Sequence, residues 1–222
     1  MKNKIMTDDA LLNECLQFFG KMSASATHEI KNDLSIINES AGLMQDLILM
    51  SENGHALSNE RLIDISKKIE SRVRKADRIL KRLNRFSHVP DEPVRQVDLE
   101  SLIRFMLDLT SRLVEMQGTR FTVVSPRSPA QVTTHLFFLQ TLIWRSIETI
   151  CLKSSTTRQV TVSFETDSSV PGIWFSMDRT DKKTIEMLLE SREEKALLAQ
   201  TGVAVKKEAE TNRFGLSWSG PV

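Results

Sequence analysis

Residues 26–48, "ATHEIKNDLSIINESAGLMQDLI", decide the fold, because their apolar side chains recur at alternating steps of four and three between Ile30 and Ile48. This spacing places the apolar side chains on one face of an α-helix. The same alternation extends back to Cys15, with one irregular step of four between Ala26 and Ile30. His28 lies inside that irregular step, about 200° around the helix from either neighbour of the seam, so we expect it to face solvent.

A second helical pattern follows a short turn. Residues 51–60, "SENGHALSNE", carry the breaker Asn53-Gly54 and a candidate N-cap at Ser58. Apolar residues then recur every seven positions from Leu62 to Leu83. Two long helices with a short connection predict an antiparallel hairpin. Its apolar stripe is only half covered, so we expect a homodimer that completes a four-helix bundle.

The chain changes character after the hairpin. Residues 87–96, "SHVPDEPVRQ", contain two prolines and mixed charge, which is typical of a linker. Helix-like patterns at 97–118, 135–155 and 180–202 then alternate with strand-like patterns at 119–126, 159–166, 172–178 and 213–220, while 203–210 fits either. The predicted fold class is α+β: a helical hairpin at 1–88, a linker at 89–96, and a small α/β sandwich at 97–222, its sheet covered on one face by helices.

Composition bears on several function classes. Thirty basic and 29 acidic residues give a net charge of +1, which does not favour nucleic acid or an anionic membrane as a partner. No apolar run reaches the roughly 20 residues that span a bilayer, so we expect a cytoplasmic protein. The two cysteines lie in apolar helical patterns, which indicates reduced, buried thiols rather than a disulfide framework or a metal site.

Three interpretations of His28 compete. It fits a surface histidine on a long helix, or the first ligand of a zinc motif whose second ligand is missing because position 32 is Asn. The third interpretation is a nucleophilic imidazole. An acidic neighbour such as Glu29, bonded to one ring nitrogen, would leave the lone pair of the other nitrogen free.

The stretch "HEIKNDL", residues 28–34, resembles the H-box of two-component histidine kinases. The resemblance extends to "ILKRLNRFSHV" at the end of the hairpin and to "VDLESLIRFMLDLTSRLVEMQGTRFTV" after it. It implies that His28 is phosphorylated, that Glu29 acts as base and orienter, and that Asn32 positions the phosphoryl group or a water. Asp33 stands where the family usually has proline, so we expect a straighter helix after the histidine.

The same resemblance implies an ATPase domain, yet the nucleotide-binding residues are largely replaced. Ile150 stands at the metal-binding Asn, Thr180 and Lys182 replace two glycines, and Gly202 alone remains of the last glycine-rich segment. Lys153 and Asp178 survive as weak candidates for ATP contacts. We therefore expect a degenerate ATPase-like domain that holds no metal and no nucleotide.

These observations favour a histidine phosphotransferase that exchanges a phosphoryl group between His28 and the aspartate of a response-regulator receiver domain. The chain itself would bind no cofactor, and the receiver would supply Mg²⁺. Alternatives are a divergent ATP-dependent kinase, a receiver phosphatase that uses Asn32, and a non-catalytic dimeric scaffold that binds a receiver or a kinase.

Overall fold

A computed structural model of the chain describes residues 2–54, 56–153, 159–166, 171–179, 185–186 and 188–218. The chain divides into two compact units. Lys21–Ser87 form one, here called the hairpin unit. Met1–Gly20 and His88–Val222 form the other, here called the sheet unit.

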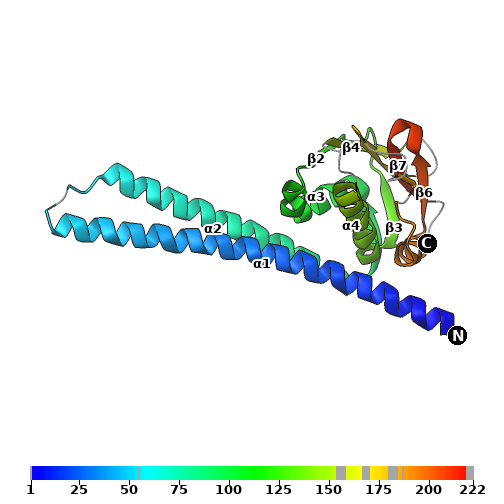
Figure 1. The fold of residues 1–222 in the computed structure, drawn as a ribbon, viewed down its shortest axis with the longest axis horizontal. Coiled ribbons are helices and arrows are strands. Elements are labelled where there is room, and N and C mark those ends of the chain that lie inside the picture. Colours follow the sequence, from blue (N-terminus) through cyan, green and yellow to red (C-terminus); the bar gives the residue numbers. More distant parts are fainter. Residues whose placement is uncertain are drawn as a thin grey trace. The chain divides into compact units, whose positions relative to one another are not determined.

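The hairpin consists of two helices, α1 (Lys2–Glu52) and α2 (Asn59–Ser87), joined by a turn (Figure 1). The turn uses Gly54 at φ 87°, a left-handed conformation that glycine adopts without steric strain. Ser58 acts as the predicted N-cap, since its Oγ accepts a hydrogen bond from the backbone N–H of Arg61 at 3.3 Å. The predicted helical hairpin is therefore confirmed. α1 is one unbroken helix of 51 residues, and it runs through Asp33, where a proline would have removed a backbone hydrogen bond.

The first part of α1 packs with the sheet unit, which differs from the predicted hairpin boundary of 1–88. Leu11, Cys15 and Phe18 share one face of the helix and are buried. The ring of Phe18 lies 6.0 Å from that of Phe137 and 6.3 Å from that of Trp144, both on α4. Because aromatic side chains bury large apolar areas, this contact attaches the start of α1 to α4. The alternation that extends back to Cys15 includes Phe19, four residues further on, yet Phe19 is only half-buried, whereas its neighbour Phe18 is fully buried.

The main sheet has five strands in the order β2-β4-β5-β7-β6. Their bounds are β2 (Arg120–Val123), β4 (Gln159–Glu165), β5 (Gly172–Met177), β6 (Val203–Glu208) and β7 (Arg213–Trp218). β2 pairs parallel with β4, and the remaining pairs are antiparallel. The four strands predicted from sequence are present, and residues 203–208, which fitted either helix or strand, form a strand.

A two-stranded sheet formed by β1 (Val94–Asp98) and β3 (Gln131–His135) was not predicted. β1 begins inside the predicted linker, and the 3₁₀ helix η1 (Val89–Asp91) precedes it. The linker prediction is therefore wrong over these residues. Pro90 lies in the first turn of η1, and Pro93 directly precedes β1, so neither proline interrupts strand pairing.

Helices α3 (Leu99–Met116) and α4 (Leu136–Lys153) lie side by side against one face of the sheet (Figure 1). α6 (Arg192–Thr201) contacts α4, and the 3₁₀ helix η2 (Ala209–Thr211) links β6 to β7. α6 covers only the last part of the helix predicted at 180–202. Residues 188–191 form a turn instead, with Leu189 at φ 57° and Ser191 as the N-cap of α6, so the prediction of one continuous helix is wrong there. Residues 180–184 and 187 lie outside the described part. The core between helices and sheet includes Ile103 of α3, Ile147 of α4 and Phe175 of β5, all fully buried. The predicted sheet covered on one face by helices is confirmed.

Candidate functional site

His28 lies on α1 within the hairpin unit, and its side chain is exposed. Asn32 is one helical turn further along, also exposed, and its side-chain Nδ2 lies 3.3 Å from His28 Nδ1. Residues four apart face each other on a helix, so this contact follows directly from the sequence spacing. The imidazole therefore has one nitrogen bonded to Asn32 and the other, Nε2, directed away from that contact.

The orientation of the Asn32 amide determines which nitrogen can attack. With Nδ2 on the ring, Nδ1 accepts a hydrogen bond and a neutral imidazole carries its proton on Nε2. Rotation of the amide by 180° presents Oδ1 instead; this oxygen accepts from Nδ1–H and leaves the Nε2 lone pair free. Asn32 can therefore select the tautomer of His28. From the sequence we had expected Glu29 to orient the ring in this way.

The side chains around His28 leave its ring accessible. Thr27 Oγ1 donates to the backbone carbonyl of Ser23 at 2.9 Å, and Ser35 Oγ donates to that of Lys31 at 3.1 Å, so both hydroxyls bond to their own helix. Glu29 is half-buried, and among the described residues no hydrogen bond or ion pair joins it to His28. The role of Glu29 as a base stays a prediction.

Asp33, next to Asn32 in sequence, is buried, with 1% of its surface exposed. Its Oδ1 accepts a hydrogen bond from Arg72 Nη1 at 3.2 Å, and its Oδ2 lies 3.6 Å from Lys75 Nζ. Both cations belong to α2, so the carboxylate connects the two helices. The sequence interpretation treated Asp33 only as a missing proline. Its position seven residues from both Ala26 and Ser40, which are buried as well, was the signal for its inward orientation.

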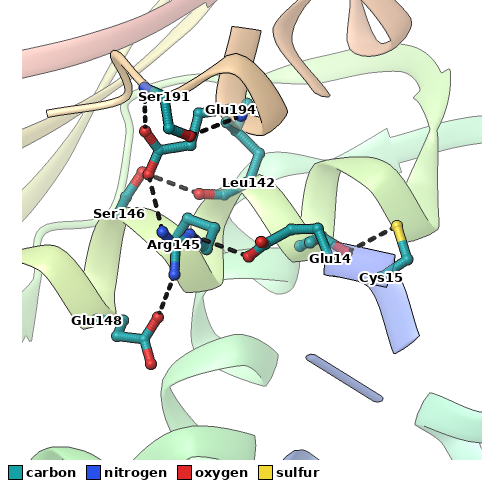
Figure 2. Close-up of polar contacts among 9 residues, drawn as sticks. Glu14, Cys15, Leu142, Arg145, Ser146, Glu148, Ser191 and Glu194 are labelled. Atoms are coloured by element: carbon teal, nitrogen blue, oxygen red, sulfur yellow. Dashed lines mark hydrogen bonds and ion pairs between the residues drawn. The ribbon is translucent and has the colours of Figure 1, made fainter. Parts of the chain in front are cut away.

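In the sheet unit, Arg145 of α4 is surrounded by three carboxylates from three helices (Figure 2). Its Nε lies 3.1 Å from Glu14 of α1, its Nη1 2.7 Å from Glu148 of α4, and its Nη2 3.4 Å from Glu194 of α6. Burial raises the pKa of Glu14 above its ordinary value. The positive charge of Arg145 lowers this pKa, whereas the negative charges of Glu148, Glu194 and Glu193 raise it further. The group carries more negative than positive charge, which disfavours a phosphate nearby.

The residues at the expected nucleotide site do not fit ATP and its metal. Ile150, at the position of the metal-binding Asn, is completely buried in the core. Asp178 is exposed, and its Oδ1 accepts a hydrogen bond from the backbone N–H of Arg179 at 2.8 Å. Gly202 at φ 65° serves as the C-cap of α6 rather than as part of a phosphate-binding loop. The side chain of Lys153 and all of Thr180 and Lys182 lie outside the described residues.

The remaining candidates for metal or redox chemistry are two thiols, of which Cys15 is buried and Cys151 is partly buried. Burial raises the pKa of Cys15 and raises that of Cys151 to about 11, so both thiols are protonated at neutral pH. Cys15 Sγ lies 3.8 Å from Thr141 Oγ1 (Figure 2). Within the described ranges, no three His, Cys, Asp or Glu side chains are grouped to hold a metal ion. Likewise, none of the helices described combines the length and the apolarity that a bilayer crossing requires.

Comparison with known proteins finds similar structures but no sequence relative. No protein-family model matches the sequence, and no curated protein matches it significantly. The histidine kinase AdeS of Acinetobacter baumannii is 10% identical, with a TM-score of 0.45, 81% of this chain and 94% of AdeS covered. The histidine kinase ThkA, solved in complex with the response regulator protein TrrA, is 15% identical, and the TM-score is 0.43. The match covers 93% of this chain and 63% of that chain. The catalytic domain of ThkA is 9% identical, with a TM-score of 0.42, 56% of this chain and 94% of that domain covered.

Proposed function

We infer that this chain is a histidine phosphotransferase of two-component signalling, which exchanges a phosphoryl group between His28 and the aspartate of a response-regulator receiver domain. The observation that carries this proposal is the exposed imidazole of His28 with Asn32 bonded to Nδ1, inside a stretch that resembles the H-box. Once the Asn32 amide is rotated so that Oδ1 accepts from Nδ1–H, the imidazole can present the Nε2 lone pair to a partner protein without help from a second domain.

In the proposed step, the Nε2 lone pair of His28 attacks the phosphorus of an aspartyl phosphate in line with the bond that breaks. The P–O bond to the aspartate carboxylate is cleaved, and its electron pair stays with that carboxylate. The proton on Nδ1 remains on the ring, bonded to Asn32 Oδ1, and the reverse reaction returns the phosphoryl group. Mg²⁺ on the receiver would stabilise the charge of the transferring group, so the hairpin needs only to position the imidazole.

The proposal assigns no ATP to the sheet unit. Ile150 offers no ligand atom and is fully buried, so a metal ion there would face hydrocarbon. Arg145 and Glu148 belong to α4, the helix that the family resemblance makes nucleotide-facing, and the three carboxylates around Arg145 would repel a triphosphate. We propose that this unit serves a structural role or a docking role.

We also propose a homodimer in which two hairpins form a four-helix bundle. Large apolar side chains remain exposed on both helices of the hairpin, among them Leu34 at 55%, Val73 at 50% and Leu80 at 52%. Leu34 belongs to the heptad seam that begins at Ile30, and Val73 and Leu80 are seven residues apart, so they form stripes rather than scattered positions. Covering these stripes with a second copy would remove apolar area from water.

One assay tests the proposal. The wild-type chain and His28→Ala are incubated either with labelled Mg-ATP or with a receiver domain labelled on its aspartate, and protein-bound label is measured. We expect label on the wild type from the receiver only, and none on His28→Ala. Label from ATP would instead indicate a kinase. If the chain takes up no label and the receiver also keeps its phosphoryl group, the result indicates a scaffold.

The second candidate function is a receiver phosphatase, favoured by the position of Asn32 beside His28. An exposed amide one turn from the histidine can orient a water toward an aspartyl phosphate as well as it can orient the ring. In the same assay this function would remove label from the receiver without transient label on the chain. Hydrolysis that persists in His28→Ala but stops in Asn32→Ala would identify it.

A further inference from the structure

Asp33 is the one ionisable side chain that is buried within the described residues of the hairpin unit, 21–54 and 56–87. Its two partners on α2, Arg72 and Lys75, are three residues apart and so lie on the same face of that helix. Their side chains are 35% and 44% exposed, so each holds the carboxylate while its own charge stays near water. Among the described residues, the structure gives the carboxylate two charge partners, Arg72 and Lys75.

The buried positions next to Asp33 on the same face of α1 are Ala26 and Ser40, each seven residues away and both small. Small side chains pack without interlocking, so they determine the axial position of one helix against another only weakly. The hydrogen bond from Arg72 Nη1 to Asp33 Oδ1 is directional, and Lys75 adds an ion pair at 3.6 Å to Oδ2. Beside the buried Ile65 and Ile79 of α2, this charged group is a feature of the stretch that distinguishes one helix register from another.

We propose that Asp33 is a positioning residue, which fixes the register of α1 against α2 and thereby the place of His28 relative to the surface of α2. The proposal rests on the proposed function, because it assumes that a receiver contacts both helices when it meets His28. A slip by one helical turn would move His28 by about 5.4 Å along α2 and would leave the buried carboxylate without a cation. The ion pair thus excludes the slipped states.

The test separates an effect on helix register from an effect on stability, because it replaces Asp33 and its partner Arg72 with apolar residues. Asp33→Leu/Arg72→Leu removes the buried charge and its main partner together, and such replacements generally leave stability unchanged or increase it. Asp33→Asn is the second variant, since it keeps the shape and removes the charge. The matched control is Asp77→Ala/Lys81→Ala, which deletes an exposed pair on α2 with a 2.7 Å contact.

Double electron–electron resonance between two spin labels measures the helix register. The labels are attached through unnatural amino acids, one at Glu39 on α1 and one at Asn84 on α2. Excess unlabelled chain suppresses signals between protomers. Phosphoryl uptake from a labelled receiver and the melting temperature are measured on the same variants. For the double variant we expect a second distance population, displaced by about 5 Å, and at least tenfold slower uptake, at a melting temperature equal to or above that of the wild type. The control pair should match the wild type in all three measurements.

Each other outcome overturns the inference or part of it. A single, unchanged distance in Asp33→Leu/Arg72→Leu and in Asp33→Asn overturns the register role, whatever the uptake rate. A second distance with unimpaired uptake overturns the link from register to His28. If the wild type takes up no phosphoryl group from any receiver, the proposed function fails, and the distance measurement still decides whether Asp33 sets the register.

Discussion

The hairpin unit and the sheet unit use their ionisable side chains in opposite ways. In the described part of the hairpin, His28 and Asn32 are exposed and contact each other, and the exposed ring remains open to a partner. In the sheet unit, Arg145 is occupied by three carboxylates, and the position where a metal ligand was expected holds the buried Ile150. Under the proposed function, the exposed pair in the hairpin is the phosphoacceptor surface, and the sheet unit needs only its packed structure.

The largest expected effect concerns the packing of the sheet unit. Phe18→Ala removes a fully buried ring from between Phe137 and Trp144, and we expect a loss of about 3–5 kcal/mol in unfolding free energy. Tryptophan fluorescence during urea unfolding measures it, because all three tryptophans lie in this unit. The matched control is Leu16→Ala on the same helix, whose side chain is 60% exposed, with a change within about 0.5 kcal/mol. Equal losses for the two variants would show that α1 does not pack against α4 in solution.

The next effect concerns the ion pairs of α4. Arg145→Met leaves Glu14, Glu148 and Glu194 close together without a cation, and we expect a loss of about 2 kcal/mol, less than for a fully buried pair because the arginine is partly exposed. Arg104→Met, which breaks a surface pair with Glu100 on α3, should cost at most about 1 kcal/mol. Chemical unfolding of both variants gives the comparison. Unfolding free energies of Arg145→Met and wild type that are equal would contradict the account, because the three carboxylates would then need no cation.

Asn32→Ala tests the role of the Asn32 amide beside His28 in the hairpin unit. The variant removes the bond to Nδ1 and frees the tautomer, so we expect phosphoryl uptake by His28 to fall by about tenfold, which corresponds to about 1.4 kcal/mol of activation free energy. Stability should change by no more than about 0.5 kcal/mol because the side chain is exposed. Asn38→Ala, an exposed asparagine further along α1, is the control. Uptake at the wild-type rate in Asn32→Ala would assign the orientation of the ring to another group, such as Glu29.

The smallest effect is the pH dependence of the sheet unit. The pKa of Glu14 is raised in the folded state, so the native protein binds the proton more tightly than the unfolded chain, and the contribution of Glu14 to stability increases as pH falls from 7 toward 5. Glu190, whose pKa Lys207 and Lys195 lower to about 2, stays ionised in this window and does not obscure the effect. Urea unfolding of wild type and Glu14→Gln at both pH values measures the difference. The stability gained by Glu14→Gln should be smaller at pH 5 than at pH 7, and a larger gain at pH 5 would contradict the sign.

Sequence reasoning succeeded where periodicity is long or alternation is clear. The heptad steps from Ile30 to Ile48 predicted α1 because apolar side chains at this spacing favour a helix, although Leu34 and Ile48 are exposed. The alternation of "QVTVSFET" predicted β4 because it reflects one buried face of that strand. The outward direction of His28 followed from its angle to the seam.

The missed features depend on contacts that no local pattern contains. The stripe of Leu11, Cys15 and Phe18 shows that α1 is amphipathic, but not that its partner is α4, more than a hundred residues away in sequence. The start of β1 was taken for a linker because the two prolines that precede it, Pro90 and Pro93, were interpreted as breakers, and β3 has only five residues. The burial of Asp33 could not be deduced from its residue type, because a carboxylate is buried only where cations such as Arg72 and Lys75 meet it.

The donor of the phosphoryl group to His28 tests the central claim most directly. ³¹P nuclear magnetic resonance of the wild-type chain is recorded after incubation with Mg-ATP alone and after incubation with a phosphorylated receiver domain. We expect a phosphohistidine signal only with the receiver, and its loss in His28→Ala. A phosphohistidine signal with Mg-ATP alone would contradict the claim that the sheet unit has lost nucleotide chemistry.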